Sequence, residues 1–435
     1  MSIKLDKIQE AVVNSNDTNI VVVAGAGSGK TRVLTERIRK LLNDGVDPAS
    51  IVAITFTNMA SEEMTQRLSD IPNYHKMFVG TIHSFANMIL RKYSTINYQL
   101  LTDEAETYIV KEICKKPNFC FSFQIYCDFK SQHYDGGKVY DYITEKYGFH
   151  ISKSLRHVLE YEPNRDYPVT VSSYAKSHNY ITFDELIEIC SDYLKDNNLV
   201  IDYLFVDEFQ DIGSLEYNFI KALNPNHNFV VGDDYQAIYG FKGATDIYFK
   251  RLLSSSYWKS YMLTNNYRCG QKIINVGNRI ISNIIDEDEE LKPSICKSNL
   301  SGEVKNFHNL NSICSIIKNK KDDFKDWFVI CRTNKEVEQI TNILSVNNIP
   351  NRTFKKYEMS FDEMKALLKE DVVKVITAHS SKGLESKNVI VAYMNPLASD
   401  RSYDRNGNIR SPEEVKLYYV AVTRAIESLY LFLNF

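Results

Sequence analysis

The sequence has no apolar run that approaches the roughly 20 residues a helix needs to span a bilayer. Its first residues also lack the basic, apolar and small-residue pattern of a secretory signal. The eight cysteines contain no CxxC pair, which favours a reducing compartment where thiols serve as small hydrophobic groups. We therefore expect no membrane partner, and a location in the cytoplasm or, for a viral protein, inside the host cell.

A strong excess of charge of either sign is also missing. Lys and Arg number 52 against 55 Asp and Glu, which gives a formal net charge of -3. A chain this balanced is not basic throughout, so any DNA or RNA site must be a local groove. With 435 residues, 44% hydrophobic and 25% charged, the composition predicts a globular protein of two or three domains.

Three cysteines, Cys114, Cys120 and Cys127, lie close together in a lysine- and aromatic-rich region. An iron–sulfur or zinc site would need a fourth ligand, such as Cys190 or His133. The spacing matches no metal-binding pattern, so we favour thiols that hold no metal.

A glycine-rich segment, Ala24–Thr31 (AGAGSGKT), follows the apolar run Ile20–Val23, and a stretch with helical periodicity comes after it. In such a strand–turn–helix, successive backbone N–H groups curl around a phosphate and Lys30 adds a positive charge. The Thr31 hydroxyl can hold Mg²⁺. Ala24 replaces the usual first glycine at little cost. An ordinary strand–helix turn is the less specific interpretation, and the context favours a nucleoside triphosphate site.

Two adjacent acids, Asp207 and Glu208, follow the apolar run Tyr203–Val206. A buried parallel strand that ends in two acids is what a P-loop ATPase needs opposite its lysine. Asp207 can hold the Mg²⁺ shell, and Glu208 can orient and deprotonate the attacking water. Acidic pairs are also common on solvated loops, so the P-loop is what makes the catalytic interpretation the stronger one.

Apolar runs alternate with amphipathic segments along the whole chain. Predicted strands are Ile20–Val23, Ile51–Ile54, Tyr203–Val206, Phe229–Val231, Trp327–Ile330, Val389–Val391 and Leu429–Leu433, and predicted helices include 32–42 and one from about Ser61. This alternation is typical of parallel, doubly wound sheets. Two such sets predict two α/β lobes.

Taken together, the motifs resemble those of the UvrD/Rep-like superfamily 1 DNA helicases, in the family's order and over nearly the whole chain. The matching segments, besides the P-loop, are Leu5–Gln9, Ile54–Leu68, Val79–Ala86, Phe205–Asp211, Val230–Ala244, Leu263–Arg268, Val375–Glu385 and Leu417–Ala425. The resemblance implies an α/β fold of tandem RecA-like P-loop lobes, with one inserted, mainly helical accessory subdomain.

The resemblance also assigns roles around ATP and Mg²⁺. Gln9 would hydrogen-bond the adenine edge, and Tyr267 would stack on its face. Gln236 would sense the γ-phosphate, while Arg268 and Arg424 would reach the phosphoryl oxygens from the second lobe; a surface cation is the less specific interpretation of either arginine. The implied catalytic residues are Lys30, Asp207, Glu208, Gln236, Arg268 and Arg424. The implied ATP-binding residues are Gln9, Ala24, Gly25, Ala26, Gly27, Ser28, Gly29, Lys30, Thr31, Arg32, Tyr267, Arg268, Glu385 (on the ribose) and Arg424, with Thr31 and Asp207 on the metal.

For DNA, the family places aromatic rings between the bases of a single strand, and such stacking tolerates any sequence. The implied DNA-binding residues are Phe56, Thr57, His83, Tyr239, Phe241, Lys242, Thr377 and His379. Lys242 stands where the family usually has arginine, so a point charge replaces a planar contact. Without the resemblance, Phe56 and Phe241 would be interpreted as ordinary core aromatics.

The resemblance divides the chain at predictable points. Residues 1–88 and 178–262 are expected to form the first lobe, 89–177 the inserted subdomain, and 263–435 the second lobe. A second accessory subdomain would fall between Pro350 and Val375, where the chain has room for about one helix, Phe361–Leu368. The family usually continues beyond the Arg424 motif with a strand-separating hairpin, whereas this sequence stops at Phe435.

The function implied is that of an ATP-dependent single-stranded DNA translocase and helicase, with a 3′-to-5′ direction taken from the family alone. An alternative is a DNA-sensing ATPase subunit of a nuclease-containing repair, recombination or defence complex. A P-loop kinase or phosphotransferase is a further alternative, which DNA dependence of ATP hydrolysis would separate from a motor. The expected partners are single-stranded or tailed DNA, with a nuclease or a replication or repair protein as a further candidate partner, and a monomer is expected in the absence of DNA.

Overall fold

The computed structural model describes residues 5–102, 179–197, 199–240, 244–284, 292–354, 359, 361–394 and 412–433. The chain divides into two compact units, Met1–Ile82 with Leu199–Phe435, and His83–Asn198. Most of the predicted subdomain 89–177 lies outside the described residues, as do the cysteines at 114–127 and the predicted DNA-binding residues Phe241 and Lys242. None of the described helices has both the length and the apolar character needed to cross a membrane.

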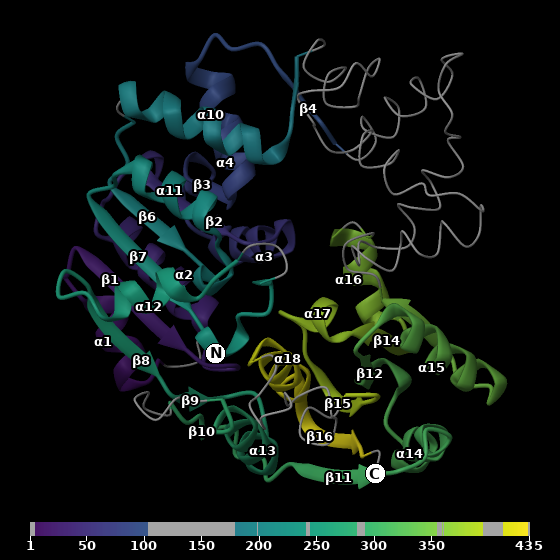
Figure 1. Ribbon diagram of the computed structural model, residues 1–435. Coiled ribbons are helices and arrows are strands. Elements are labelled where there is room, and N and C mark those ends of the chain that lie inside the picture. Colours follow the sequence, from purple (N-terminus) through teal and green to yellow (C-terminus); the bar gives the residue numbers. More distant parts are fainter. Residues whose placement is uncertain are drawn as a thin grey trace, which may run out of the picture. The chain divides into compact units, whose positions relative to one another are not determined.

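The first part of the larger unit is built on a parallel six-stranded sheet of order β3-β2-β6-β7-β1-β8 (Figure 1). The strands are β1 (Asn19–Ala24), β2 (Ile51–Thr55), β3 (Phe78–Thr81), β6 (Tyr203–Val206), β7 (His227–Gly232) and β8 (Lys259–Leu263). The helices are α1 (Lys7–Asn14), α2 (Lys30–Asn43), α3 (Asn58–Leu68), α11 (Ser214–Leu223) and α12 (Ile247–Leu253). Alternate β1 residues Ile20 and Val22 share a buried core with Val33 of α2 and Met64 of α3, because side chains of a strand alternate between its two faces.

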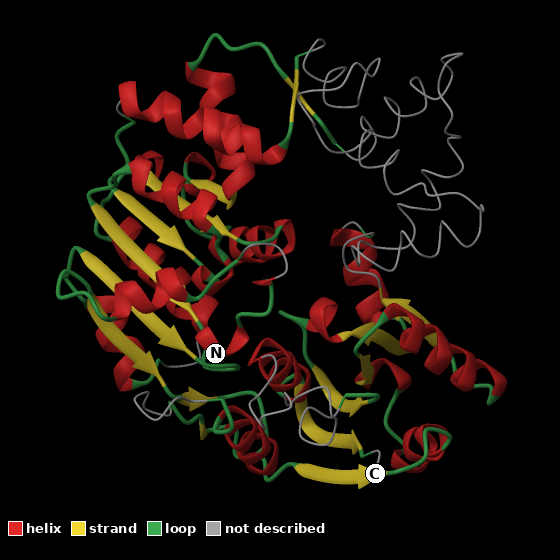
Figure 2. Cartoon of the chain, viewed as in Figure 1, coloured by secondary structure: helices red, strands yellow, loops and turns green. Residues whose placement is uncertain are grey.

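A second parallel six-stranded sheet, of order β11-β16-β15-β12-β14-β13, forms the rest of this unit (Figure 2). Its strands are β11 (Glu303–Phe307), β12 (Trp327–Cys331), β13 (Asn351–Phe354), β14 (Val373–Thr377), β15 (Ser386–Val391) and β16 (Ala425–Phe432). Its helices are α13 (Gln271–Ile281), α14 (Ser312–Lys320), α15 (Asn334–Val346), α16 (Phe361–Lys369), α17 (Ala378–Ser381) and α18 (Pro412–Val422). The short strands β9 (Asn265–Asn266) and β10 (Ile295–Cys296) pair with each other near the junction of the two parts.

The faces of the second sheet follow the same alternation along β12. Val329 packs with α14 and α15, whereas Phe328 and Ile330 pack with α13 and α18. The predicted α/β fold with two parallel sheets is therefore confirmed. Residues 355–372 join β13 to β14 and contain α16, so the helix predicted for this interval is confirmed as well.

Two predicted boundaries were wrong. Helix α3 begins at Asn58 and not near Ser61, because the Thr57 hydroxyl accepts the Ala60 N–H at 3.2 Å and caps the helix earlier. The last strand begins at Ala425 and not at Leu429, since Ala425 already pairs with Ser386 of β15, and it ends at Phe432.

The described part of the smaller unit contains α4 (Ile82–Tyr93), β4 (Gln99–Leu100), β5 (Tyr180–Ile181) and α10 (Phe183–Asp196). Strands β4 and β5 pair in parallel. The Tyr193 hydroxyl of α10 donates a 2.9 Å hydrogen bond to the Tyr93 carbonyl at the end of α4. Residues far apart in the sequence therefore hold the two ends of this insertion together.

Candidate functional site

The glycine-rich segment after β1 has the backbone geometry of a phosphate-binding loop. Gly27 and Gly29 have φ angles of 67° and 87°, which favour glycine. A Cβ on Gly27 would also lie 2.8 Å from the Cβ of Arg268. The Ser28 hydroxyl donates to the Gly25 carbonyl at 2.8 Å and closes the loop. Helix α2 begins at Lys30, so its unpaired N-terminal N–H groups are available for an anion.

The Lys30 ammonium is held beside this loop. It donates to the Ala24 carbonyl at 3.1 Å and lies 3.9 Å from Asp233 Oδ2. Asp233 directly follows β7, the neighbour of β1 in the sheet. The carboxyl ends of two adjacent strands therefore place the lysine, as parallel sheets commonly place ligand-binding groups.

The two acids after β6 differ in environment. Burial and the neighbouring charge of Glu208 raise the pKa of Asp207 to about 7. Burial acts in the same direction on Glu208, but the positive charges of Lys30 and Lys382 outweigh it and lower the pKa of Glu208 to about 2. Glu208 also has a φ of 52°, a conformation that costs a residue other than glycine about 1–3 kcal/mol and clusters at functional sites.

Thr31 and Asp207 supply the oxygen atoms that Mg²⁺ prefers. The Thr31 hydroxyl lies 3.4 Å from Asp207 Oδ2, so both groups face one point. Among the residues that the structure describes, no cluster of three or more His, Cys, Asp or Glu is placed to hold a metal ion. Mg²⁺ is usually held by one or two carboxylates together with substrate phosphates, so this pair fits it.

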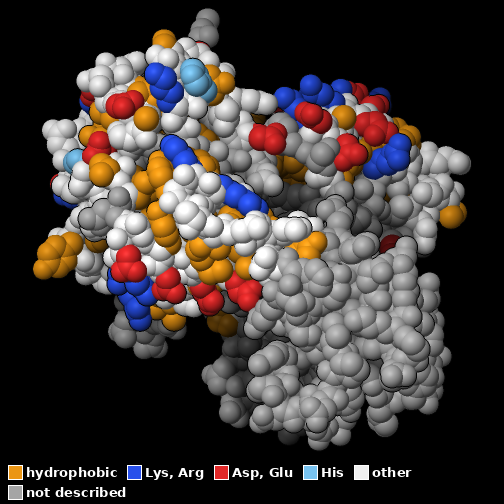
Figure 3. All heavy atoms as spheres, turned by 90° about the horizontal axis from the view of Figure 1, so that it is seen from above, with side chains coloured by type: hydrophobic (Ala, Val, Ile, Leu, Met, Phe, Trp, Pro, Cys, Tyr) orange, Lys and Arg blue, Asp and Glu red, His pale blue; other side chains and the backbone are white. Residues whose placement is uncertain are grey.

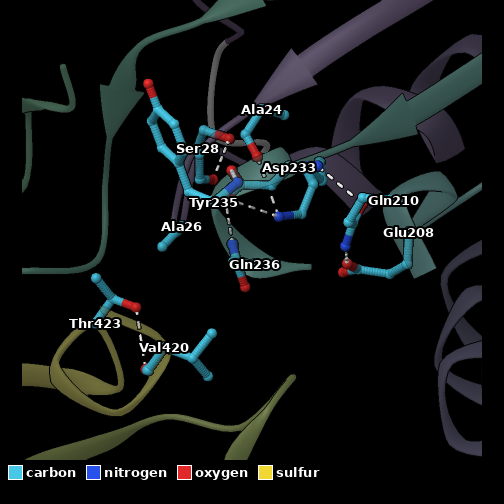
Figure 4. Close-up of polar contacts among 12 residues, drawn as sticks. Ala24, Ala26, Ser28, Glu208, Gln210, Asp233, Tyr235, Gln236, Val420 and Thr423 are labelled. Carbon is cyan, nitrogen blue, oxygen red and sulfur yellow. Dashed lines mark hydrogen bonds and ion pairs between the residues drawn. The ribbon is translucent and has the colours of Figure 1, made fainter. Parts of the chain in front are cut away.

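A chain of side-chain hydrogen bonds links Glu208 to the segment after β7 (Figure 4). Gln210 donates to Glu208 Oε2 at 2.6 Å and accepts the Asp233 N–H at 2.9 Å. Gln236 in turn donates to Asp233 Oδ2 at 2.5 Å. The predicted phosphate-sensing residue Gln236 is thus connected to both the acid pair and the lysine partner. Gln210 and Asp233 lie within the matching segments Phe205–Asp211 and Val230–Ala244, but the resemblance alone assigns them no role in the site.

Arg424 reaches the same network from the second part of the unit. Its Nη2 donates to Gln236 Oε1 at 3.4 Å, and its other groups donate to the carbonyls of Val420 (2.9 Å) and Leu384 (3.1 Å). Burial lowers the pKa of Arg424 to about 10. A buried guanidinium with these partners is a positioned residue and not a surface cation.

Arg268 approaches from a different side. Its Nε donates to the carboxylate of Glu385, and its Nη1 lies 3.5 Å from the Thr423 carbonyl. The side chain of Arg268 is 18% exposed. Glu385, which the resemblance placed on the ribose, is therefore an ion-pair partner of Arg268 in this structure.

The sequence-based prediction missed Lys382, which lies between α17 and β15. Its ammonium forms an ion pair with Asp211, donates to the Gln236 carbonyl at 2.8 Å and lies 3.7 Å from Glu208 Oε2. The position of Lys382 within the matching segment Val375–Glu385 was the available signal.

Gln9 and Tyr267 lie at the other end of the phosphate loop. The buried Gln9 amide donates to the Ser28 carbonyl at 3.0 Å. The Tyr267 hydroxyl donates to Asp6 Oδ2 at 2.5 Å, and its backbone N–H donates to the Gly27 carbonyl at 2.9 Å. Gln9 thus contacts the loop, and Tyr267 contacts both the loop and Asp6, the residue that caps α1. Tyr267 is 42% exposed.

The predicted DNA-binding aromatics Phe56 and Tyr239 stack on each other, with ring centroids 5.2 Å apart. His379 lies beside Tyr239 at 6.2 Å. Thr57 and Thr377 cap helices α3 and α17, so their hydroxyls have structural partners. His83 belongs to the smaller unit. Among the described residues on the face drawn in Figure 3, basic and acidic side chains are interspersed.

Together, the glycine-rich loop, the acids Asp207 and Glu208, and Arg424 have the arrangement of a P-loop nucleoside triphosphate site of the tandem RecA-like class. Comparison with known families identifies it further. The family model described as UvrD/REP helicase N-terminal domain matches residues 5–255, and the one described as UvrD-like helicase C-terminal domain matches 261–363 and 354–434. The chain belongs to the UvrD/Rep helicase family.

Curated relatives agree with this assignment. A probable DNA helicase of Mycoplasma pneumoniae is 28% identical over 98% of this chain and 83% of its own length. A probable DNA helicase II homolog of the same organism is 28% identical over 85% of the chain, and the ATP-dependent DNA helicase Rep of Buchnera aphidicola is 29% identical over 83%. The chain spans 56% and 59% of the lengths of these last two proteins.

Proposed function

We propose that this chain hydrolyses ATP and uses the energy to move along single-stranded DNA in the 3′-to-5′ direction, with helicase activity on tailed duplexes. The observation that carries the proposal is the position of Gln236. It is hydrogen-bonded to Asp233, beside Lys30, and to Arg424, which directly precedes β16 of the second sheet. A group that contacts both halves of the site can report the state of the phosphates to the rest of the molecule.

The chemistry follows from the residues assembled here. The loop N–H groups and Lys30 would bind the phosphates, and Arg268 and Arg424 would stabilise charge on the transferred phosphoryl oxygens. The ionised Glu208 would orient the attacking water and accept its proton. Mg²⁺ held at Thr31 and Asp207 would neutralise charge on the phosphate oxygens.

DNA would bind through stacking and local positive charge. The rings of Phe56 and Tyr239 are in direct contact, so a base can enter between them only if one ring moves. Gln236 lies three residues before Tyr239 in the same segment, so a movement of Tyr239 on DNA binding would be close enough in the chain to affect Gln236 and the hydrolysis of ATP. The expected division into lobes 1–88 with 178–262 and 263–435, around an insertion at 89–177, is part of this proposal.

Residues 355–372 are too few for the second accessory subdomain that the resemblance leads one to expect. We therefore infer that stepping along a single strand is stronger than unwinding, because melting must also overcome about 1.4 kcal/mol of stacking per base-pair step.

The test is the rate of ATP hydrolysis with and without a single-stranded oligonucleotide. The account predicts strong stimulation by single-stranded DNA, little by a blunt duplex, and no turnover for Lys30→Ala under either condition. A rate that ignores DNA would favour a kinase or another phosphotransferase.

A further inference from the structure

Helix α18 carries functional groups at both of its ends. Arg424 lies just beyond its last residue, and Glu413 lies in its first turn. Glu413 Oε1 accepts the backbone N–H of Gly240 at 2.9 Å. Gly240 directly follows Tyr239, one of the aromatic residues that the resemblance assigns to DNA binding. One end of the helix therefore contacts the predicted ATP site, and the other contacts the residue next to Tyr239.

Both contacts are made to the same short stretch of chain. Gln236 Oε1 accepts from Arg424, and four residues later the Gly240 N–H donates to Glu413. Glu413 and Val420 are seven residues apart, so they fall within about 20° of one face of the helix. Arg424 folds back to donate to the Val420 carbonyl at 2.9 Å. The helix, about 16 Å long, is thus attached to residues 236–240 at two points along one face.

The Glu413 carboxylate lies in the space beside Gly240. A Cβ on Gly240 would lie 2.8 Å from Glu413 Oε2, so a larger residue there would displace this flexible carboxylate. One turn further along α18, Lys416 forms a 2.8 Å ion pair with Asp246, which follows the same segment. The side chains of this ion pair are 15% and 21% exposed. The Glu413–Gly240 hydrogen bond itself lies at an exposed position, and because its acceptor is ionised it is about twice as strong as a neutral one.

From this geometry we propose that Glu413 is a positioning residue that ties the segment of Tyr239 and Gly240 to Arg424. DNA bound next to Gly240 would, through Glu413 and the rigid helix α18, hold Arg424 against Gln236 and so raise the rate of ATP hydrolysis. The inference rests on the proposed function, because it concerns how DNA binding reaches the ATP site.

The neighbouring residue Glu414 offers a matched control. It forms a bidentate ion pair with Arg332, with N–O distances of 2.5–3.0 Å. Arg332 follows β12 of the second sheet, so this pair lies within one part of the unit and does not touch the 236–240 segment. Loss of the Glu414 charge perturbs the same helical turn without the proposed connection.

The experiment compares Glu413→Ala, Glu413→Gln and Glu414→Gln with the parent protein. ATP turnover is measured without DNA and with saturating oligo(dT), and oligo(dT) affinity is measured by fluorescence anisotropy. For Glu413→Ala we expect stimulation by DNA to fall about tenfold, while DNA-free turnover and affinity stay within about threefold. Glu413→Gln keeps an acceptor oxygen and should retain stimulation within about threefold of the parent, as should Glu414→Gln.

A double-mutant cycle with Gly240→Ala tests the contact itself. The added methyl group displaces the Glu413 carboxylate, so Gly240→Ala should lose stimulation as Glu413→Ala does, and the double variant should be no worse than either single variant. Additive losses in the double variant would overturn the inference. Glu413→Ala would also overturn it by losing DNA-free and DNA-stimulated turnover equally, because that result indicates a merely structural role.

The outcome also separates this inference from the proposed function. A parent protein that is stimulated by DNA together with an equally stimulated Glu413→Ala variant would overturn the inference alone. A parent protein whose turnover ignores DNA would overturn both.

Discussion

The ammonium of Lys382 and the carboxylate of Asp211 form an ion pair whose side chains are 7% and 0% exposed. Lys382 lies in the half of the larger unit that contains the second sheet. Asp211 lies in the half that contains the first sheet, three residues after Glu208. The same ammonium donates to the Gln236 carbonyl. One lysine thus links three segments of the site, and its charge is one of those that keep Glu208 ionised.

Replacing this lysine should therefore affect catalysis more than binding. For Lys382→Met we expect DNA-stimulated ATP turnover to fall at least about 100-fold, because the ammonium helps to keep the general base Glu208 ionised and holds Asp211 and the Gln236 carbonyl. The unpaired Asp211 should also lower the free energy of unfolding by about 3–5 kcal/mol. Steady-state kinetics would measure the loss, with Lys387→Met as the control, since Lys387 pairs with Asp322 at a more exposed position. Turnover by Lys382→Met within threefold of the parent would show that the pair is not needed for hydrolysis.

The two arginines should both matter for the rate. Arg268→Ala and Arg424→Ala are each expected to lower the turnover number about 10³-fold or more, with a much smaller loss of nucleotide affinity, because they act on transition-state charge. Arg424→Lys should not rescue, since a lysine cannot replace the separate hydrogen bonds to Val420, Leu384 and Gln236. Near-normal turnover of either alanine variant with DNA bound would make that arginine structural.

Much of this site could be predicted from the sequence, because its parts occur at the ends of apolar strands. The P-loop and the acids at Asp207 and Glu208 follow strands β1 and β6, and parallel strands bring their carboxyl ends to one edge. Lys382 and Glu413 could not be found in this way. Their partners, Asp211 and Gly240, are more than 170 residues away in the sequence, and no local pattern encodes such a contact.

The boundaries that failed have a similar cause. The start of β16 depends on the pairing of Ala425 with Ser386, which local hydrophobicity does not reveal. The start of α3 depends on one hydroxyl, that of Thr57. The position of Glu385 was predicted from its motif, but its pairing with Arg268 depends on the fold.

The stacked rings of Phe56 and Tyr239 lead to a prediction for DNA binding. Tyr239→Ala should weaken single-strand binding by about 1–3 kcal/mol with little sequence preference. Affinity for the parent and the variant should fall with salt at the same slope, about -0.7 per phosphate neutralised, because the ring carries no charge. Fluorescence titrations at several salt concentrations measure both quantities. A changed salt slope, or unaltered affinity, would mean that Tyr239 does not stack on the bases.

The lowered pKa of Lys374 in β14 leads us to expect that the stability of the protein depends on pH. Its buried ammonium donates to the carbonyls of Lys325 (3.2 Å) and Glu370 (2.8 Å), and burial lowers its pKa from 10.5 to about 8. Between these two values the unfolded chain keeps a proton that the folded chain has lost, so stability rises with pH. The stability of the parent relative to Lys374→Met should therefore increase between pH 8 and 10.5, by on the order of 2 kcal/mol. Urea denaturation at pH 7, 8.5 and 10 would test this, and a constant difference would contradict it.

The most direct measurement of the central claim is directional movement on single-stranded DNA. Streptavidin is bound to a biotin at either the 5′ or the 3′ end of an oligonucleotide, and its ATP-dependent displacement is followed with free biotin as a trap. The account predicts rapid displacement from the 5′ end, slow displacement from the 3′ end, and none at either end with Glu208→Gln, which should still bind ATP. DNA-stimulated hydrolysis without displacement from either end would contradict the claim that this chain is a motor.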